Sequence, residues 1–198
     1  MESPKIAVFI DVGNLWSSYK ELGKLLDFNK VESFLSKKFG KEIHKIFYYV
    51  AYPKEGTREK EIIDGLHRFF TYLQKRLGFE VRKKELKTIY IRKEGEIVRD
   101  EKGKPVTEEK GNFDIEITID SLVNMLHYDT AVFFTGDSDF LPVVNYLKKM
   151  GKRVCVFSTK GCVSRELKTG AEYFDLIDCK EIHGTALVHR KEKEIIQK

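Results

Sequence analysis

The stretch IAVFID (residues 6–11) is a run of five apolar residues that ends in an acid, and AVFFTGDSD (residues 131–139) has the same form. An unbroken run of β-branched and aromatic residues is typical of a strand covered on both faces, as in a parallel sheet between two layers of helices. Ligands of such sheets bind at the carboxyl ends of the strands. Both stretches therefore predict strands that carry carboxylates to one ligand-binding edge.

A third acidic segment, KGNFD (residues 110–114), lies just before the second of these strands, and Asp120 follows it. Because three separate segments bring acids to strand ends or to a helix start, we expect Asp11, Asp114, Asp137 and Asp139 to surround one pocket. Clustered carboxylates repel one another unless a cation holds them together. Oxygen ligands of this kind suit Mg²⁺ or Mn²⁺, and both metals commonly serve phosphoryl chemistry.

Each acid also has a structural interpretation. Asp11, Asp114 and one acid of the 137–139 pair stand where helices begin, and each could be a helix N-cap. Asn14 could cap the helix after Asp11, or it could position a water or a phosphate. Asp120 lies off the apolar face of its helix, so it is equally well explained as a surface acid paired with a lysine.

Strand and helix patterns alternate along most of the 198 residues. The expected strands are residues 6–11, 43–52, 79–81, 130–135, 153–158 and 174–177. The expected helices are residues 15–26, 30–39, 58–77, 114–125, 140–150 and 163–169. In the fourth helix, we expect the core-facing residues to be Ile115, Ile119, Leu122, Val123 and Leu126. This order predicts an α/β fold, a three-layer α/β/α sandwich with a mainly parallel sheet. We expect a single domain over residues 1–182 and a charged tail over 183–198.

The regular alternation fails over residues 87–109, where the sequence predicts a small β-hairpin insert. We expect its strands at 88–92 and 96–99, followed by a charged turn at 100–104. Residues 75–110 carry twelve Lys and Arg against eight Glu and Asp. This bias favours binding to a nucleic-acid backbone, although a solvated charged hairpin explains it equally well. The candidate phosphate-binding residues are Lys83, Lys84, Lys87, Arg92, Lys93 and Lys110.

Several functional classes are disfavoured by composition. The three cysteines have no CxxC spacing and the five histidines form no HExxH pattern, which argues against a zinc hydrolase. Neither GxxxxGK[ST] nor GxGxxG is present, which argues against a nucleotide-binding protein. There is no apolar run of roughly 20 residues, and residues 1–4 do not resemble a signal peptide. We therefore expect a cytoplasmic protein without a membrane span.

The chain resembles the NYN family, a branch of the PIN-like metal-dependent nucleases, and in particular its LabA-like members. The resemblance extends from about residue 5 to residue 182. It is carried by FID (residues 9–11) with Asn14, by KGNFD (110–114) with Asp120, by TGDSDF (135–140) and by GKRV (151–154). Family members often have Asp-Gly-Asn or Asp-Gly-Glu-Asn after the first strand. Here the acid and the amide of that motif are kept as Asp11 and Asn14.

The resemblance implies a PIN-like, Rossmann-like domain with an acidic pocket for Mg²⁺ or Mn²⁺. Transferred by position, the metal ligands or water activators are Asp11, Asp114, Asp137 and Asp139. The supporting residues are Asn14, Asp120 and Ser138. The implied activity is hydrolysis of RNA phosphodiester bonds by metal-activated water, with single-stranded DNA as an alternative substrate. The rival function is a nucleic-acid-binding or regulatory protein with little or no turnover. The sequence leaves open whether the protein forms a homodimer.

Overall fold

Six parallel strands form the central sheet of the computed structural model, which describes residues 4–186. Their order across the sheet is β11-β10-β9-β1-β3-β4, and every neighbouring pair is parallel. The strands are β1 (Lys5–Asp11), β3 (Glu42–Tyr52), β4 (Glu80–Glu85), β9 (Thr130–Phe134), β10 (Arg153–Ser158) and β11 (Glu172–Asp175). The expected parallel α/β sheet is thus confirmed.

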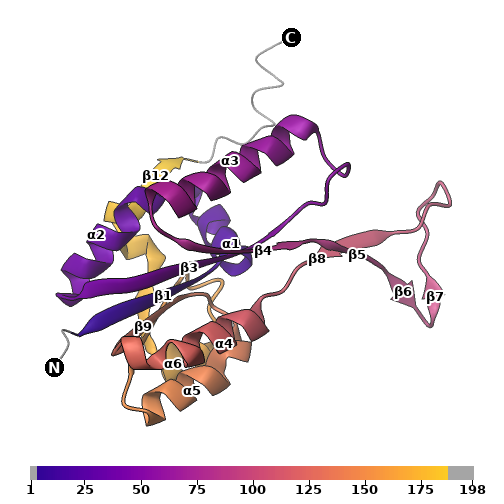
Figure 1. Ribbon diagram of the computed structural model, residues 1–198. Coiled ribbons are helices and arrows are strands. Elements are labelled where there is room, and N and C mark those ends of the chain that lie inside the picture. The colour runs from indigo at the N-terminus through magenta and orange to yellow at the C-terminus, as the bar shows by residue number, and fades with distance from the viewer. Residues whose placement is uncertain (1–3, 187–198) are drawn as a thin grey trace.

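Helices cover both faces of this sheet (Figure 1). The helices on one face are α1 (Val12–Leu22), α2 (Phe28–Phe39) and α3 (Lys60–Arg76), and those on the other are α4 (Asp114–Val123), α5 (Leu141–Lys149) and α6 (Arg165–Gly170). Four short 3₁₀ turns complete the helical structure described: η1 (Met125–His127), η2 (Ser138–Phe140), η3 (Leu176–Asp178) and η4 (Lys180–Ile182).

Side chains alternate along each strand between the two helical layers. In β1, Val8 and Ile10 face the layer of α1, α2 and α3, while Phe9 faces the layer of α4, α5 and α6. Phe9 stacks between Phe47 and Phe133 from the two neighbouring strands, with ring centroids 5.3 and 5.0 Å away. This double-sided core is why the strands read as unbroken apolar runs. No helix within residues 4–186 is both long and apolar enough to cross a membrane.

The order of strands reverses beside β1. The chain passes from β1 outward to β3 and β4, then returns to the other side of β1 to form β9, β10 and β11. The helix after β1 and the helix after β9 therefore lie on opposite faces of the sheet. A crevice forms at the carboxyl ends of two strands that diverge in this way. Here those ends are Asp11 and the loop that begins at Thr135.

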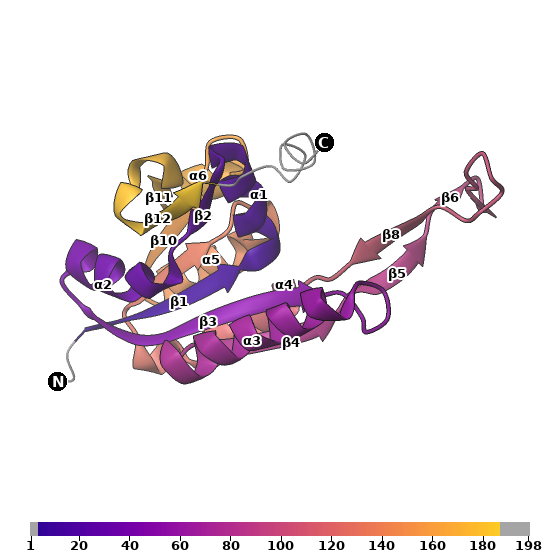
Figure 2. The ribbon, with the colours of Figure 1, turned by 90° about the horizontal axis from the view of Figure 1, so that it is seen from above.

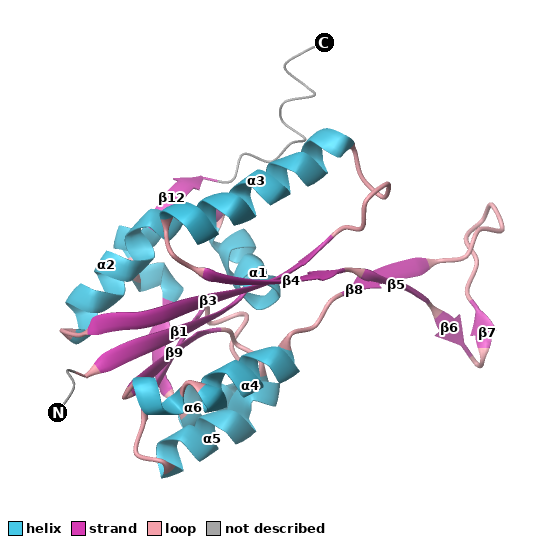
Figure 3. Cartoon of the chain, viewed as in Figure 1, coloured by secondary structure: helices cyan, strands magenta, loops and turns pink. Residues whose placement is uncertain are grey.

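A long arm leaves the sheet after β4 and returns just before α4. Its inner part pairs β5 (Lys87–Tyr90) antiparallel with β8 (Thr107–Lys110), and its outer part pairs β6 (Arg92–Lys93) with β7 (Glu96–Ile97). Glu94 and Gly95 form the tight turn between β6 and β7 and both have positive φ, 54° and 90°, as a type I′ hairpin turn requires. Figures 1 and 2 show the arm projecting well beyond the sheet, and Figure 3 shows that it contains only strands and loops.

The hairpin prediction was right about the turn and about the pairing next to it, where Arg92 pairs with Ile97 and Val98 donates to the Ile91 carbonyl oxygen. It was wrong about the inner residues. Residues 88–90 pair with 107–109 rather than with 96–99, because the chain folds back a second time at the charged turn around Asp100. Thr107–Lys110 has no alternating apolar pattern, so the sequence did not mark it as a strand.

The first helix is shorter than expected. It starts at Val12, because the Asp11 carboxylate caps it, and it ends at Leu22, because Gly23 takes the left-handed conformation with φ of 64°. Residues 24–26 then form β2 (Lys24–Leu26), which pairs antiparallel with β12 (His183–Ala186). The expected tail at 183–198 therefore begins with a paired strand, and residues 187–198 lie outside the described part of the chain.

The core face expected around α4 was wrong at four of its five residues, and Leu122 alone of the five packs against the core. Ile115, Ile119, Val123 and Leu126 are 71%, 51%, 67% and 85% exposed. The helix packs on the sheet through Ile117 instead, together with the neighbouring Phe113 and Ser121. Two apolar faces exist on this helix, and the sequence pattern alone favoured the one that contacts solvent.

Candidate acidic site at the carboxyl edge of the sheet

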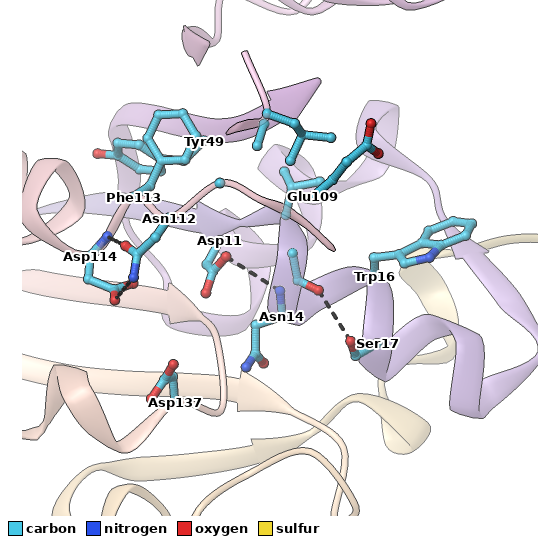
Figure 4. Close-up of a pocket in the computed structure, with 15 residues that line it drawn as sticks. Asp11, Asn14, Trp16, Ser17, Tyr49, Glu109, Asn112, Phe113, Asp114 and Asp137 are labelled. Carbon is cyan, nitrogen blue, oxygen red and sulfur yellow. Dashed lines mark hydrogen bonds between the residues drawn. The ribbon is translucent and has the colours of Figure 1, made fainter. Parts of the chain in front are cut away.

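A cavity of about 520 Å³ opens at the carboxyl edge of the sheet. It is lined by the turn after β1, the ends of β3 and β8, the loop before α4 and the loop after β9. Figure 4 shows Asp11, Asp114 and Asp137 around this hollow. Glu109 also lines it but is paired with Arg58 at 2.6 Å. No lysine, arginine or histidine is among the lining residues, so three carboxylates face the cavity without a cationic partner in its wall.

Asp11 is held in place by both of its oxygens. Oδ1 accepts a hydrogen bond from the backbone N–H of Asn14 at 3.4 Å, and Oδ2 accepts one from the Thr135 hydroxyl at 3.1 Å. The first bond is the helix cap, so Asp11 does cap α1. A carboxylate has about four lone-pair sites, so these two bonds leave acceptor capacity on a residue that lines the cavity.

Asn14 joins the two acid-tipped strands. Its side-chain Oδ1 accepts a hydrogen bond from the backbone N–H of Gly136 at 2.7 Å. Gly136 itself packs so closely against the loop at Cys162 that an added Cβ would lie 2.2 Å from the carbonyl oxygen of that residue. The glycine thus fixes how closely the loop after β9 approaches, and Asn14 acts as a positioning residue.

Asp114 is the first residue of α4 and not its N-cap. Its backbone N–H donates to the side-chain oxygen of Asn112 at 2.7 Å, and its carboxylate accepts a bond from the Asn112 amide. The loop reaches this position by crossing β3 at Gly111, where an added Cβ would lie 2.2 Å from the Ala51 Cβ. Only a residue without a side chain allows this crossing.

Asp137 and Asp139 differ in position. Asp137 lines the cavity, and its Oδ1 accepts the backbone N–H of Asp139 at 3.0 Å, which caps η2. Asp139 and Ser138 are exposed and are not among the lining residues. Of the four acids predicted to share one pocket, Asp11, Asp114 and Asp137 line the cavity, and Asp139 lies beside it.

Burial and mutual repulsion shift the acids of the cavity. Burial raises the pKa of Asp11 most, and the charges of Asp114 and Asp137 raise it further, against the lowering effect of the bonds from Asn14 and Thr135. Burial also raises the pKa of Asp114, together with the charges of Asp137 and Asp139. The four carboxylates therefore form one electrostatic group even though they come from three segments.

Asp120 has a different environment from the other acids. Its carboxylate accepts hydrogen bonds from the Tyr49 hydroxyl at 2.9 Å and from Arg82 Nε at 3.2 Å, and it does not line the cavity. Its structural interpretation was nearly right, with an arginine in place of the lysine. Tyr49 lines the cavity, so Asp120 contributes to the site by holding that side chain.

The acids do not form a closed ligand set as they stand. Within residues 4–186, no three His, Cys, Asp or Glu side chains converge closely enough to hold a metal ion. The donor chemistry nevertheless matches a hard divalent cation, since carboxylate oxygens surround a space whose wall contains no positive charge. A cation would relieve the repulsion that raises the pKa of Asp11 and Asp114.

The candidate phosphate-binding residues divide into three groups. Lys84, Lys87 and Lys110 line a groove of about 590 Å³ that shares Gly111 and Asn112 with the acidic cavity. Arg92 and Lys93 lie in β6, in the outer part of the arm (Figure 2).

Lys83 is the remaining candidate. It neighbours Phe70, with Nζ 5.8 Å from the ring centroid, and therefore lies on the opposite face of the sheet from Lys84, which neighbours Phe113. The positive excess of the region is also unevenly placed. Residues 87–110 carry seven basic and six acidic residues, and the excess lies at 75–84.

Some residues of the site had no clear signal in the sequence. Trp16, Tyr49 and Thr135 lie inside the expected elements 15–26, 43–52 and 130–135 but were not expected as site residues, yet all three contact the acids or line the cavity. The two glycines that permit close approach, Gly111 and Gly136, were part of the motifs but their role depends on chain crossings that only the fold reveals.

Comparisons with known proteins agree with this architecture. The model of the NYN domain family matches residues 5–178. The low amplitude and bright protein LabA of Synechococcus elongatus is 28% identical over 177 residues, which cover 89% of this chain and 86% of that protein. An uncharacterized protein of Methanocaldococcus jannaschii is 35% identical over 65 residues, covering 32% of this chain and 27% of that protein.

One solved structure also matches over most of the chain. It is a protein of unknown function from Vibrio parahaemolyticus, with a TM-score of 0.64 and 22% identity, and the match covers 93% of this chain and all of that one. At this level of identity, the likeness extends to the fold alone.

Proposed function

Because the chain belongs to the NYN domain family, we propose that it is a metal-dependent ribonuclease that hydrolyses RNA phosphodiester bonds. The observation that carries this proposal is the cavity at the switch point of the sheet. Three carboxylates without cationic partners line it, and they come from three segments that the fold brings together. A cluster of like charges costs stability, and a functional site is where a protein tolerates such a cost.

Asp11, Asp114 and Asp137 are the residues proposed to hold Mg²⁺ or Mn²⁺, with Asp139 as the fourth acid beside them. When bound, such a cation lowers the pKa of a coordinated water, contacts a phosphate oxygen and offsets charge on the leaving group. Hydrogen bonds within the site support this arrangement of the acids. Asp11 is oriented by Thr135 and by the start of α1, and Asn14 ties this turn to Gly136.

The substrate proposed is RNA, with single-stranded DNA as the alternative. An acidic cavity repels a phosphate backbone, so a neighbouring basic surface is needed to bind the strand. The groove lined by Lys84, Lys87 and Lys110 adjoins the cavity and meets this requirement. Part of its charge is already neutralised, since Lys84 pairs with Glu116 at 2.5 Å and Lys110 with Glu108 at 3.3 Å.

Labelled RNA and DNA strands incubated with Mg²⁺, Mn²⁺ or EDTA test the proposal. We expect cleavage of RNA with a divalent metal and none in EDTA. Asp137→Asn serves as the matched inactive variant, because asparagine keeps the oxygen that caps η2. Binding of RNA without cleavage under every metal condition would contradict the enzyme and favour a regulatory RNA-binding protein. Cleavage that persists in EDTA would indicate a contaminating nuclease.

A further inference from the structure

A second hollow, of about 270 Å³, lies next to the acidic cavity, and its lining is apolar and aromatic. The residues that line it are Val12, Leu15, Trp16, Tyr19, Leu25, Leu26, Phe28, Tyr48 and Phe69. Val12 and Trp16 line both hollows. The two spaces therefore adjoin along the first turns of α1, which start directly after Asp11.

Trp16 stands at the boundary between them. Figure 4 shows it at the opposite end of the acidic cavity from Asp114. The side chain is 52% exposed although the rest of the hollow provides apolar contacts. It is also the only tryptophan of the chain. A half-exposed indole beside the acidic cavity presents an aromatic face to a ligand.

Tyr19 contributes its ring to the wall of the same hollow. The residue is 2% exposed, and its hydroxyl is buried away from the surface of the hollow, without a hydrogen-bond partner within residues 4–186. The wall therefore offers a ligand ring faces and aliphatic groups. A flat, aromatic ligand fits a wall of this kind.

A nucleobase meets these requirements. We propose that the hollow binds one unpaired nucleobase of an RNA strand, stacked on Trp16, while the adjoining phosphate lies at the acidic cavity, where a bound cation would offset the charge of the acids. This inference rests on the proposed function and narrows its substrate. A base inside a duplex is stacked and paired, so the substrate would be single-stranded RNA or an unpaired loop. The hollow adjoins the acidic cavity at Val12 and Trp16, so its occupant should be linked to the group that binds in that cavity. A nucleobase linked to a phosphate meets this condition, whereas an apolar side chain of a partner protein does not.

The fluorescence of Trp16 reports occupancy directly, without cleavage. In EDTA, uridine and adenosine, which carry no phosphate for the acids to repel, are titrated against the intact protein, with ribose as the control that lacks a base. We expect saturable quenching by the nucleosides and none by ribose. Equal quenching by ribose, or no quenching by any of the three, would overturn the proposal.

Substitutions test the same site with RNA. Trp16→Ala is expected to weaken binding of single-stranded RNA in EDTA by about 5-fold to 150-fold, the range that corresponds to loss of one base stack. Tyr146→Ala is the matched control, since Tyr146 is 47% exposed but lies on α5, across the sheet. Unchanged RNA affinity in Trp16→Ala would overturn the proposal.

The outcomes separate this inference from the proposed activity. RNA cleavage that is metal-dependent and unaffected by Trp16→Ala would retain the nuclease and reject the nucleobase pocket. Saturable nucleoside quenching without any cleavage would support the pocket and reject the enzyme. The apolar probe ANS provides the remaining comparison. If ANS binds the protein and nucleosides do not displace it although they are in excess, the hollow is an apolar docking site and the proposal is wrong.

Discussion

The carboxyl edge of the sheet and the arm are built in opposite ways. At the edge, Asp11, Asn14 and Thr135 are tied to one another through hydrogen bonds and supported by a core packed on both faces. In the arm, β5 is exposed along its whole length and pairs with a single strand. The edge can therefore hold side chains at fixed positions, as catalysis requires, whereas the arm contributes only exposed surface and charge. We therefore expect substitutions at the edge to change activity more than substitutions in the arm.

The largest effect is expected at the edge. Asp137→Asn should reduce metal-dependent RNA cleavage by more than about 100-fold, because even residues behind a metal ligand change activity by about 10-fold to 100-fold. The free energy of unfolding in EDTA should be unchanged or higher, since one of several repelling charges is removed. Cleavage rates and chemical denaturation measure the two quantities. A variant that is much less stable but equally active per folded molecule would show that Asp137 is only a cap.

Asp120→Asn provides the contrast within the same edge. Its carboxylate is bonded to Tyr49 and Arg82, so the expected loss is in stability, about 1–3 kcal/mol. Cleavage per folded molecule should stay within a few-fold of wild type. A loss of activity as large as that of Asp137→Asn, with stability unchanged, would place Asp120 among the groups that contact the metal or the substrate.

The next effect is expected where the two regions meet. Gly111→Ala places a methyl group against Ala51 at a position with no space for it, and overpacking of this kind costs about 1–3 kcal/mol. The loop that carries Asp114 should shift, so cleavage should fall as well. Gly95→Ala, at the outer turn of the arm, is the control, because no atom lies within 4 Å of its added Cβ. It strains only that turn and should leave cleavage unchanged.

A smaller effect is expected in the arm and its base. Replacing Lys87 and Lys110 by glutamine should flatten the salt dependence of RNA binding, and the slope should fall by about 0.7 for each phosphate that the protein no longer neutralises. Replacing Arg92 and Lys93 should change it less, because the outer part of the arm does not border the cavity. Binding isotherms at several salt concentrations measure both. Equal slopes for wild type and the Lys87 and Lys110 variant would show that RNA approaches the edge from another face.

The smallest effect is a pH dependence of stability. The folded-state pKa of Asp114 is raised, chiefly by burial, so the folded state binds its proton more tightly than the unfolded state does. The carboxyl group therefore favours folding most below its unfolded pKa of about 3.9, and this advantage is lost as pH rises through the folded pKa. Asp114→Asn should gain stability relative to wild type between pH 4 and pH 7 in EDTA. A difference that stays constant across this range would contradict the assignment.

The sequence predicted the edge much better than the arm. Runs such as residues 6–11 and 131–135 identify buried parallel strands, because both faces of such strands contact helices. The acids that follow these runs are then expected at the carboxyl edge of the sheet. The pairing of β5 with β8 depends on contacts between residues about twenty apart in polar segments, which leave no periodic pattern. The face of α4 was missed because Ile115 and Ile119 have the correct spacing for a core but lie on the solvent side.

Asp120 and Trp16 show the corresponding limit for the site. An acid in the motif of a family can bond to a neighbouring tyrosine and arginine instead of facing the cavity, and helical spacing cannot distinguish a core tryptophan from one at a rim. Both outcomes depend on which side chains neighbouring strands supply.

The exposed strands of the arm have a further consequence for the solubility of the protein. Residues 88–91 (TIYI) combine strong β-propensity with exposure of Ile89, Tyr90 and Ile91, a composition that promotes intermolecular strand pairing and aggregation. Lys87 and Arg92 flank this segment on both sides, where charges oppose such pairing. Alanine at these two positions would remove that protection, so glutamine or serine is the better neutral replacement in solution experiments. The same lysine that borders the basic groove thus helps to keep separate copies of the chain from joining through their arms.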